Sequence, residues 1–345
     1  MKSWNSTLLL CLLAAGCNGQ PRLYPKTRGT LGPVPVTIQV VATGRWQARQ
    51  ATNEALAAVS QVNNLLSSYL PHSEVSTLNR NAGRACHVSS QTATVLRRAK
   101  EIAELTDGAF DVTAGPLITL WKRTMTAAER YASGERKTPP KPPTTTELDQ
   151  ARKLVGYRRL ELAENSARLA LEGMHIDLGG IAKGHAVDKA VEALRANGVQ
   201  GSLIDAGGDG YALGTRPDGT PWRVGIRHPR GKRNERLARI LLLSDMAYAT
   251  SGDYEQYTEI DGVRYAHIID PRTGRPAPNA VSVTVLAPDC TTADALATAV
   301  TVLGPGEGLR IIETLDRVEC MIITADADGA LRIVTSRGFG AFLAD

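Results

Sequence analysis

The chain has 345 residues, of which 43% are hydrophobic and 22% charged, and this balance excludes a wholly disordered protein. Aromatic residues make up only 5%, which argues against a stacking platform for single-stranded nucleic acid. There is no repeat typical of a solenoid or propeller, and no CxxC or Cys/His cluster typical of structural zinc. With a formal net charge of +5, we expect contacts with phosphates, anionic lipid or an acidic partner, and none with nucleic acid.

The N-terminus has the pattern of a secretory signal. Lys2 precedes an apolar run from Leu8 to Ala15 that is too short to span a bilayer. The run ends in Leu-Ala-Ala-Gly-Cys, which resembles a bacterial lipobox and implies cleavage before Cys17 and lipidation of that cysteine. We therefore expect a signal peptide at 1–16, a tether at 17–29, and a periplasmic protein lipid-anchored to the inner or outer bacterial membrane.

The rest of the chain mixes helices and short strands. Periodicity predicts helices at 46–66, 91–105, 147–155, 183–197, 291–303 and 305–314. It predicts strands at 34–42, 174–178, 201–205, 210–214, 221–226, 239–243, 263–269, 280–286, 318–324 and 330–335, and a β-pair within 158–172. Four prolines within five positions predict an exposed loop over 134–146. Because the elements lack regular βαβ alternation, the fold class is α+β, in one unit over 30–345.

Three cysteines follow the signal region, at Cys86, Cys290 and Cys320. One disulfide is possible in an oxidising compartment, but an odd thiol would remain. We expect buried free thiols.

A glycine-rich segment in the second half combines charge with turn residues. Asp177 ends a predicted strand, Gly179 and Gly180 form a turn, and Lys183 begins a helix. Glycines allow a ligand to approach the backbone closely, and a helix N-terminus that carries a lysine attracts phosphate. A plain strand-to-helix turn with an incidental lysine is the alternative.

Two further positions suggest chemistry. Asp294 and Thr298 are four residues apart on a predicted helix, hence on one face, and form an oxygen pair suited to Mg²⁺ rather than zinc. His267 closes a predicted strand beside the Asp-Pro-Arg-Thr-Gly turn. The alternatives are an ordinary helix start for the pair and a structural histidine. The turn from Asp205 to Gly210 is at least as consistent with a tight structural turn.

Taken in order, these segments resemble the ApbE-type flavin transferases, the FAD:protein FMN transferases. The resemblance covers residues from about 30 to 345 and rests on SSYLPHSEVSTLN, GAFDVTAGPLITLW, IDLGGIAKGHAVDKA, DAGGDGYALG, WRVGIRHP, TSGDYE, YAHIIDPRTGRP and TADALATAVTVLG. It implies a T-fold-related α+β unit of two lobes with the FAD site between them. It also implies Mg²⁺-dependent transfer of FMN from FAD to a threonine of a target protein, with release of AMP.

The resemblance also assigns residues. It places FAD against Leu31, Tyr69, Ala109, Phe110, Asp111, Asp177, Lys183 and Ile268, with Leu31 standing where the family has a methionine. It places the metal on the backbone carbonyl of Gly180, with Asp294 and Thr298.

A threonine hydroxyl needs a base, for which His267 is our candidate, with Asp270 and Asp253 as alternatives. The expected acceptor is a subunit of a sodium-pumping or Rnf-type redox complex, or another exported flavoprotein, with a Ser/Thr-Gly-Ala-Thr-like motif. A FAD pyrophosphatase that uses water as acceptor and a non-catalytic flavin-binding lipoprotein are the competing hypotheses. The basic run from Arg223 to Arg239 is interpreted as a solvated face.

Overall fold

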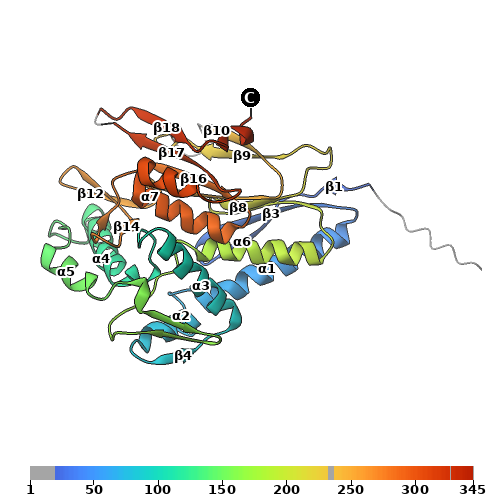
Figure 1. Cartoon of the computed structure of the whole chain (residues 1–345). Coiled ribbons are helices and arrows are strands. Elements are labelled where there is room, and N and C mark those ends of the chain that lie inside the picture. Colours follow the sequence, from blue (N-terminus) through green and yellow to red (C-terminus); the bar gives the residue numbers. More distant parts are fainter. Residues whose placement is uncertain (1–19, 232–236, 327, 345) are drawn as a thin grey trace, which may run out of the picture.

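A large antiparallel sheet forms the centre of the molecule (Figure 1). The structure is a computed structural model that describes residues 20–231, 237–326 and 328–344, so Cys17 and the predicted signal peptide lie outside the described residues. Within them the sheet has nine strands in the order β1-β3-β7-β8-β11-β16-β17-β18, with β2 also paired to β3. The strands are β1 (Arg22–Leu23), β2 (Thr27–Leu31), β3 (Val34–Ala42), β7 (Gly201–Ala206), β8 (Asp209–Leu213), β11 (Met246–Gly252), β16 (Ser282–Ala287), β17 (Glu319–Ala325) and β18 (Leu331–Thr335).

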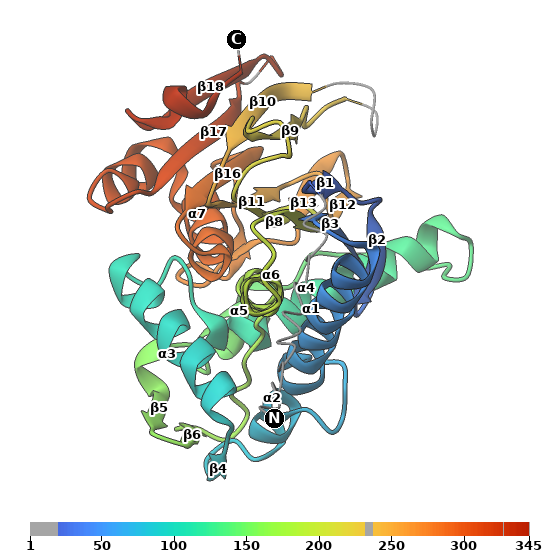
Figure 2. The same ribbon diagram turned by 90° about the vertical axis from the view of Figure 1, so that its right-hand side faces the viewer.

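The two faces of this sheet are covered differently (Figures 1 and 2). Helices α1 (Arg45–Leu66), α6 (Ala182–Ala196) and α7 (Cys290–Ile312) pack on one face and bury the main hydrophobic core. The hairpin of β9 (Trp222–Arg227) and β10 (Leu237–Leu243) lies over the other face with η3 (Phe339–Phe342). A sheet buried on both faces explains why β8 and β16 are buried along their whole length rather than at alternate residues.

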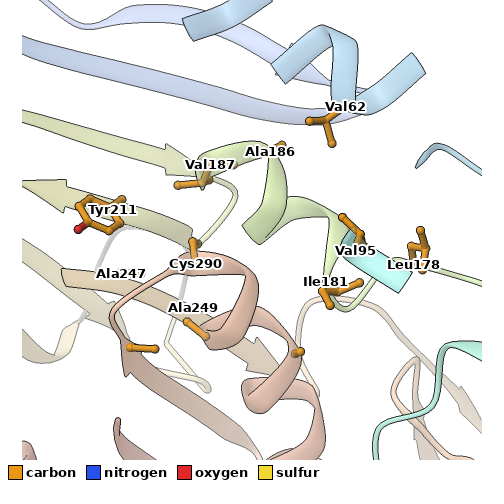
Figure 3. Packing of buried hydrophobic residues seen from close by; sticks show 14 of the residues in the cluster. Val62, Val95, Leu178, Ile181, Ala186, Val187, Tyr211, Ala247, Ala249 and Cys290 are labelled. Atoms are coloured by element: carbon orange, nitrogen blue, oxygen red, sulfur yellow. The ribbon is translucent and has the colours of Figure 1, made fainter. Parts of the chain in front are cut away.

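Helix α6 lies at the centre of the helical layer, between α1 and α7 (Figure 3). Figure 3 shows Ala186 and Val187 on α6 facing Val62 of α1 on one side and Cys290 of α7 on the other. The buried side of α1 is mostly alanine and valine at helical spacing, which lets the helices approach closely.

A second group of elements lies beyond these helices, on the side away from the large sheet (Figures 1 and 2). It contains α2 (Glu74–Arg80), α3 (Ser90–Leu105), η2 (Tyr157–Arg159) and a small sheet of β4 (Ala85–His87), β5 (Leu160–Ala163) and β6 (Ser166–Leu169). Beside it, η1 (Val112–Ala114), α4 (Gly115–Ala132) and α5 (Thr145–Arg152) adjoin the hairpins β12 (Tyr257–Ile260) with β13 (Val263–Ala266), and β14 (Ile269–Asp270) with β15 (Arg275–Pro276). Trp121 of α4 stacks on Tyr265 of β13 with ring centroids 5.2 Å apart, and this fixes α4 against the hairpin.

Most predicted elements are confirmed within a few residues, and the α+β class is confirmed. The two helices predicted at 291–303 and 305–314 form one element, α7, with a kink at Gly304, whose φ of 73° is left-handed. The loop over 134–146 is largely exposed, as predicted. The strand predicted over 263–269 divides into β13 and β14.

Two expectations were wrong, and some elements were not predicted. Part of the stretch predicted as a tether is β-structure instead. Strands β1 (Arg22–Leu23) and β2 (Thr27–Leu31) both pair with β3 in antiparallel fashion through backbone hydrogen bonds. Residues 174–178 are not a strand. The side-chain amide of Asn79 donates to the carbonyl of Ile176 and accepts a hydrogen bond from its N–H, so neither group is left for a neighbouring strand. Helix α4 and strand β11 were not predicted at all.

The described cysteines Cys86, Cys290 and Cys320 are free thiols, as expected, although only Cys290 and Cys320 are fully buried. Helix α7 is long and apolar enough to cross a membrane by composition, but it is mostly buried against the sheet and is the core helix of the fold.

Helices α6 and α7 touch at Gly184, where a Cβ atom would lie 2.1 Å from the carbonyl oxygen of Cys290. We expect Gly184→Ala to lower the free energy of unfolding by about 3 kcal/mol, because the two backbones must separate. Gly306→Ala is the control, since a Cβ there has no neighbour within 4 Å, and it should be neutral or stabilise by up to about 1 kcal/mol. Urea denaturation measures both, and equal effects of the two substitutions would contradict the contact.

Candidate functional site

Three charged side chains meet where α6 begins. The Lys183 ammonium pairs with the Asp209 carboxylate and lies 3.9 Å from Oδ1 of Asp294. Both carboxylates are almost fully buried. Burial alone would lower the pKa of Lys183, but the attraction of Asp209 and Asp294 holds it well above its ordinary value, so the lysine stays cationic. The two carboxylates therefore have a fixed counter-charge.

The carboxylate of Asp294 on α7 is positioned by two residues of α6. Its Oδ2 accepts a hydrogen bond of 3.0 Å from the backbone N–H of Gly184, which leaves Oδ1 facing the ammonium of Lys183. Burial raises the pKa of Asp294, against the opposing effects of Lys183 and of the Gly184 N–H. A cation bound at Oδ1 would offset this cost of burial.

Thr298 lies one turn further along α7 and beside the glycine turn. A Cβ on Gly180 would lie 2.8 Å from Oγ1 of Thr298 and 3.3 Å from the ring of Phe110. The hydroxyl of Thr301 on the same helix bonds back to the carbonyl of Ala297, but Thr298 makes no such bond within the described residues. Its oxygen is thus available to a ligand.

These groups fit a hard divalent cation. Asp294 supplies a carboxylate oxygen, Thr298 a hydroxyl, and the turn at Gly180 brings bare backbone beside them, which is an all-oxygen set of the kind that Mg²⁺ prefers. In the described part of the chain no group of three or more His, Cys, Asp or Glu side chains is placed to hold a metal ion, so a metal here would depend on the hydroxyl and backbone oxygens as well. The sequence-predicted metal residues are therefore brought together.

Asp177 connects the glycine turn to a second polar cluster. Its Oδ1 accepts the N–H of Gly179 at 2.8 Å, and its Oδ2 lies 3.0 Å from the Lys122 ammonium. Lys122 also donates to the hydroxyl of the exposed Tyr69 at 3.2 Å. Burial would lower the pKa of Lys122, but Asp177 and Tyr69 outweigh it and raise that pKa.

The segment 109–112 lies beside the same turn, since the Val112 carbonyl accepts the N–H of Asp177. Ala109 packs with Ile268 in a small buried apolar cluster, and Phe110 reaches the glycine turn. Asp111 differs from the other predicted residues, because its carboxylate accepts three hydrogen bonds from Thr113 and Tyr157 and so holds its own loop.

Leu31 lies at the end of β2 in the main core rather than in either polar cluster. The β2–β3 turn that follows it adjoins a second glycine turn, since a Cβ on Gly207 would lie 2.7 Å from Val34. That second turn leads into Asp209, the partner of Lys183.

His267 is held in one tautomer. Its Nδ1 lies 3.1 Å from the carbonyl oxygen of Gln256, and because a carbonyl only accepts, Nδ1 carries the proton and Nε2 keeps its lone pair. Burial lowers the pKa of His267, and the nearby cations Lys183 and Lys122 lower it further. The imidazole is therefore a neutral base at pH 7.

Neither alternative base is free. Asp253 forms a two-point ion pair with Arg230, with both distances 2.7 Å. Asp270 likewise binds Arg272 through both carboxylate oxygens. An arginine so placed occupies both carboxylate oxygens and keeps them from a substrate hydroxyl. Arg230 belongs to the predicted basic run, of which residues 232–236 lie outside the described residues.

Sequence reasoning missed three charged residues here. Asp209 was noted only as part of a turn, although it directly follows the glycine pair Gly207–Gly208 at the start of β8. Lys122 could not be placed without α4, whose signals were Pro116 in its first turn and apolar residues at helical spacing. Glu255, whose pKa burial raises to about 7, interacts electrostatically with Lys183 and Asp209.

Comparison with known proteins settles the family. The family model described as "ApbE family" matches residues 34–322 of this chain. The chain belongs to the ApbE family. A FAD:protein FMN transferase of Vibrio cholerae is 35% identical over 345 residues, covering 99% of both chains. One of Treponema pallidum is 33% identical, covering 94% of this chain and 91% of its own.

Solved ApbE structures agree with the fold. The flavin transferase ApbE from Vibrio cholerae has a TM-score of 0.80 at 34% identity, and 94% of this chain and 100% of that chain are covered. The ApbE protein from Thermotoga maritima has a TM-score of 0.79 at 31% identity, with 93% and 100% covered. The mixed α+β architecture is thus that of ApbE flavin transferases.

The central ion pairs give a stability prediction. Lys183→Met should lower the free energy of unfolding by about 3 kcal/mol, because it leaves the buried carboxylates of Asp209 and Asp294 without a counter-charge. Lys189→Met on the same helix is the matched control, and its loss of a partly exposed pair with Glu192 should cost less than about 1 kcal/mol. Chemical denaturation without divalent cations distinguishes the two, and a Lys183 variant as stable as the control would contradict the assignment.

Proposed function

We propose that this protein is a Mg²⁺-dependent FAD:protein FMN transferase that moves FMN from FAD to a threonine hydroxyl and releases AMP. The observation that carries the proposal is the meeting of Asp294, Thr298 and the Gly180 turn with Lys183 at the start of α6. An oxygen set for a hard cation beside a partly exposed lysine at a helix N-terminus suits a pyrophosphate.

The surroundings suit the rest of FAD. We place the substrate between two parts of the molecule, the large sheet with its covering helices and the group formed by η1, α4 and α5. This is the T-fold-related arrangement of two lobes expected of the family. The isoalloxazine would contact Tyr69 and the segment Ala109–Asp111, with Ile268 in the apolar cluster beside it. Asp177, Lys183 and Leu31 complete the proposed contacts.

The chain's own residues then support the transfer. The acceptor threonine oxygen forms a bond to the phosphorus of the FMN half, the bond to the bridging oxygen breaks, and AMP leaves. Nε2 of His267 takes the threonine proton, which its neutral state and fixed tautomer allow at pH 7. Lys183 stays charged and contributes fixed positive charge near the phosphates.

Asp294, Thr298 and the Gly180 carbonyl would hold the metal. When bound, Mg²⁺ supplies charge neutralisation of the pyrophosphate and of the leaving phosphate.

The cellular setting is part of the proposal. The lipobox ending at Cys17 supports export and a lipid anchor, which would place the enzyme on the periplasmic side of a bacterial membrane. Its acceptors would be exported or membrane-bound flavoproteins that carry a Ser/Thr-Gly-Ala-Thr-like motif.

The direct experiment incubates the soluble chain with FAD, Mg²⁺ and a domain that carries such a threonine, followed by a denaturing gel. We expect a fluorescent acceptor band that disappears with EDTA and falls at least about 100-fold in rate with Asp294→Asn. Free FMN and AMP with a dark acceptor would support a pyrophosphatase instead, and intact FAD throughout would support a storage protein.

A matched pair of substitutions separates metal binding from helix packing. Thr298→Val should raise the Mg²⁺ concentration needed for half-maximal transfer, because it removes a ligand oxygen. Thr301→Val removes a hydroxyl that bonds only within α7 and should leave this concentration unchanged.

The base gives a pH prediction. A neutral imidazole is present above the pKa of His267 and is lost as pH falls through it, and this pKa is lowered from 6.5, so transfer should decline only in acid below that value. His267→Asn keeps a donor for the Gln256 carbonyl but has no basic lone pair, and kcat should fall about 10²–10⁴-fold. An Asp253→Asn variant should have a kcat within a few-fold of the wild type. If this variant lost more activity than His267→Asn, the base would be Asp253 instead.

A further inference from the structure

A basic groove runs along the outer side of α4, next to the proposed FAD site. Its volume is about 680 Å³, and it lies between α4 and the loop that follows the helix. Lys122, Arg123 and Arg130 line it from the helix, and Glu135, Arg136 and Lys137 line it from the loop. Five of these six charges are positive.

Most of this positive charge is not neutralised within the protein. Lys122 pairs with Asp177, and Arg130 lies 3.5 Å from Glu135. Among the described residues, no carboxylate lies within 4.0 Å of Arg123, Arg136 or Lys137, which are all exposed. The groove thus presents three cations that form no ion pair among the described residues, with Glu147 interacting electrostatically with Arg123 from a greater distance.

The wall of the groove is built before any partner arrives. Gly134 takes a left-handed φ of 80° to reverse the chain, and the N–H of Arg136 donates to the carbonyl of Arg130. The stretch of prolines that follows Lys137 then stiffens the loop. A preformed groove loses less conformational entropy on binding than a mobile one.

The position of the groove relates it to the reaction. Lys122 forms one end of it and also contacts Tyr69 and Asp177, which belong to the proposed FAD site. From Arg123 to Arg130 the helix rises by about 10 Å, which matches about three residues of extended chain. The groove therefore suits a short segment of a partner whose neighbouring residues enter the site.

We propose that this groove docks an acidic segment of the acceptor protein and so delivers its threonine to the bound FAD. The inference rests on the proposed function and names a recognition element for its protein substrate. Because the groove is positively charged, the segment that binds it should carry negative charge. The recessed shape of the groove favours a protruding peptide segment over a flat membrane surface.

The test uses two acceptor domains that differ only beside the Ser/Thr-Gly-Ala-Thr-like segment, one with a run of Asp residues and one with Asn in their place. At low salt we expect the wild-type enzyme to show an approximately tenfold lower KM for the acidic acceptor, and added salt should reduce this preference. The variant Arg123→Glu/Lys137→Glu should lose the preference while its KM for FAD stays unchanged. The control Arg45→Glu/Arg49→Glu changes the charge equally on the exposed side of α1 and should keep the preference.

Three other outcomes would overturn the inference. Equal KM values for both acceptors with the wild-type enzyme, or a preference that survives in the groove variant, would overturn the inference while leaving the transferase intact. The groove would be a membrane contact instead if the groove variant lost the binding to phosphatidylglycerol-containing vesicles that the wild-type enzyme shows. Its acceptor kinetics and its interaction with phosphatidylcholine vesicles would then be the same as those of the wild type.

A binding measurement keeps the inference testable without turnover. If the wild-type enzyme flavinylates neither domain, the proposed function fails for these acceptors. Fluorescence anisotropy of a labelled Asp-rich peptide then tests binding to the groove separately from turnover. The inference requires the peptide to bind the wild-type protein and the α1 control, and to bind the groove variant more weakly.

Discussion

The close backbone contact between α6 and α7 is the constraint on which the site depends. Gly184 has no side chain, so the start of α6 lies directly against Cys290 at the start of α7, and its N–H holds Asp294. Asp188, one turn later on α6, accepts both N–H groups of Cys290 and Thr291 and fixes the same crossing from the other side. This geometry is what places Lys183, from one helix, beside Asp294 and Thr298, from the other.

Charge in this region is arranged around buried carboxylates. Asp209 and Asp294 share the cation Lys183, while Asp177 uses one oxygen to hold the glycine turn and the other to bind Lys122. Each acid is thus oriented by groups of the protein itself. A preorganised set of this kind needs little rearrangement when a metal and a pyrophosphate bind, which is how fixed charges contribute most to phosphoryl transfer.

Many of the helices, strands and site residues could be predicted from the sequence, wherever the local pattern agrees with the final fold. Asp294 and Thr298 were paired by helical spacing alone, and the glycine turn at Gly179–Gly180 follows from its composition. Lys122 was not predicted, because its partners Tyr69 and Asp177 are about 50 residues away in sequence on either side, and only tertiary packing of α4 joins them. Residues 174–178 failed for the same reason, since the amide of Asn79 from a distant helix replaces the strand partners that their pattern suggested.

We propose that a single point, where the Gly180 turn and the start of α6 meet α7, holds the metal for the transfer. A crystal of the protein grown with FAD and soaked in Mn²⁺ tests this directly by anomalous scattering. We expect a peak within coordination distance of Asp294, Thr298 and the Gly180 carbonyl, next to the FAD pyrophosphate. A peak elsewhere, such as beside Asp209 and Glu255, with none at Asp294, would contradict this assignment.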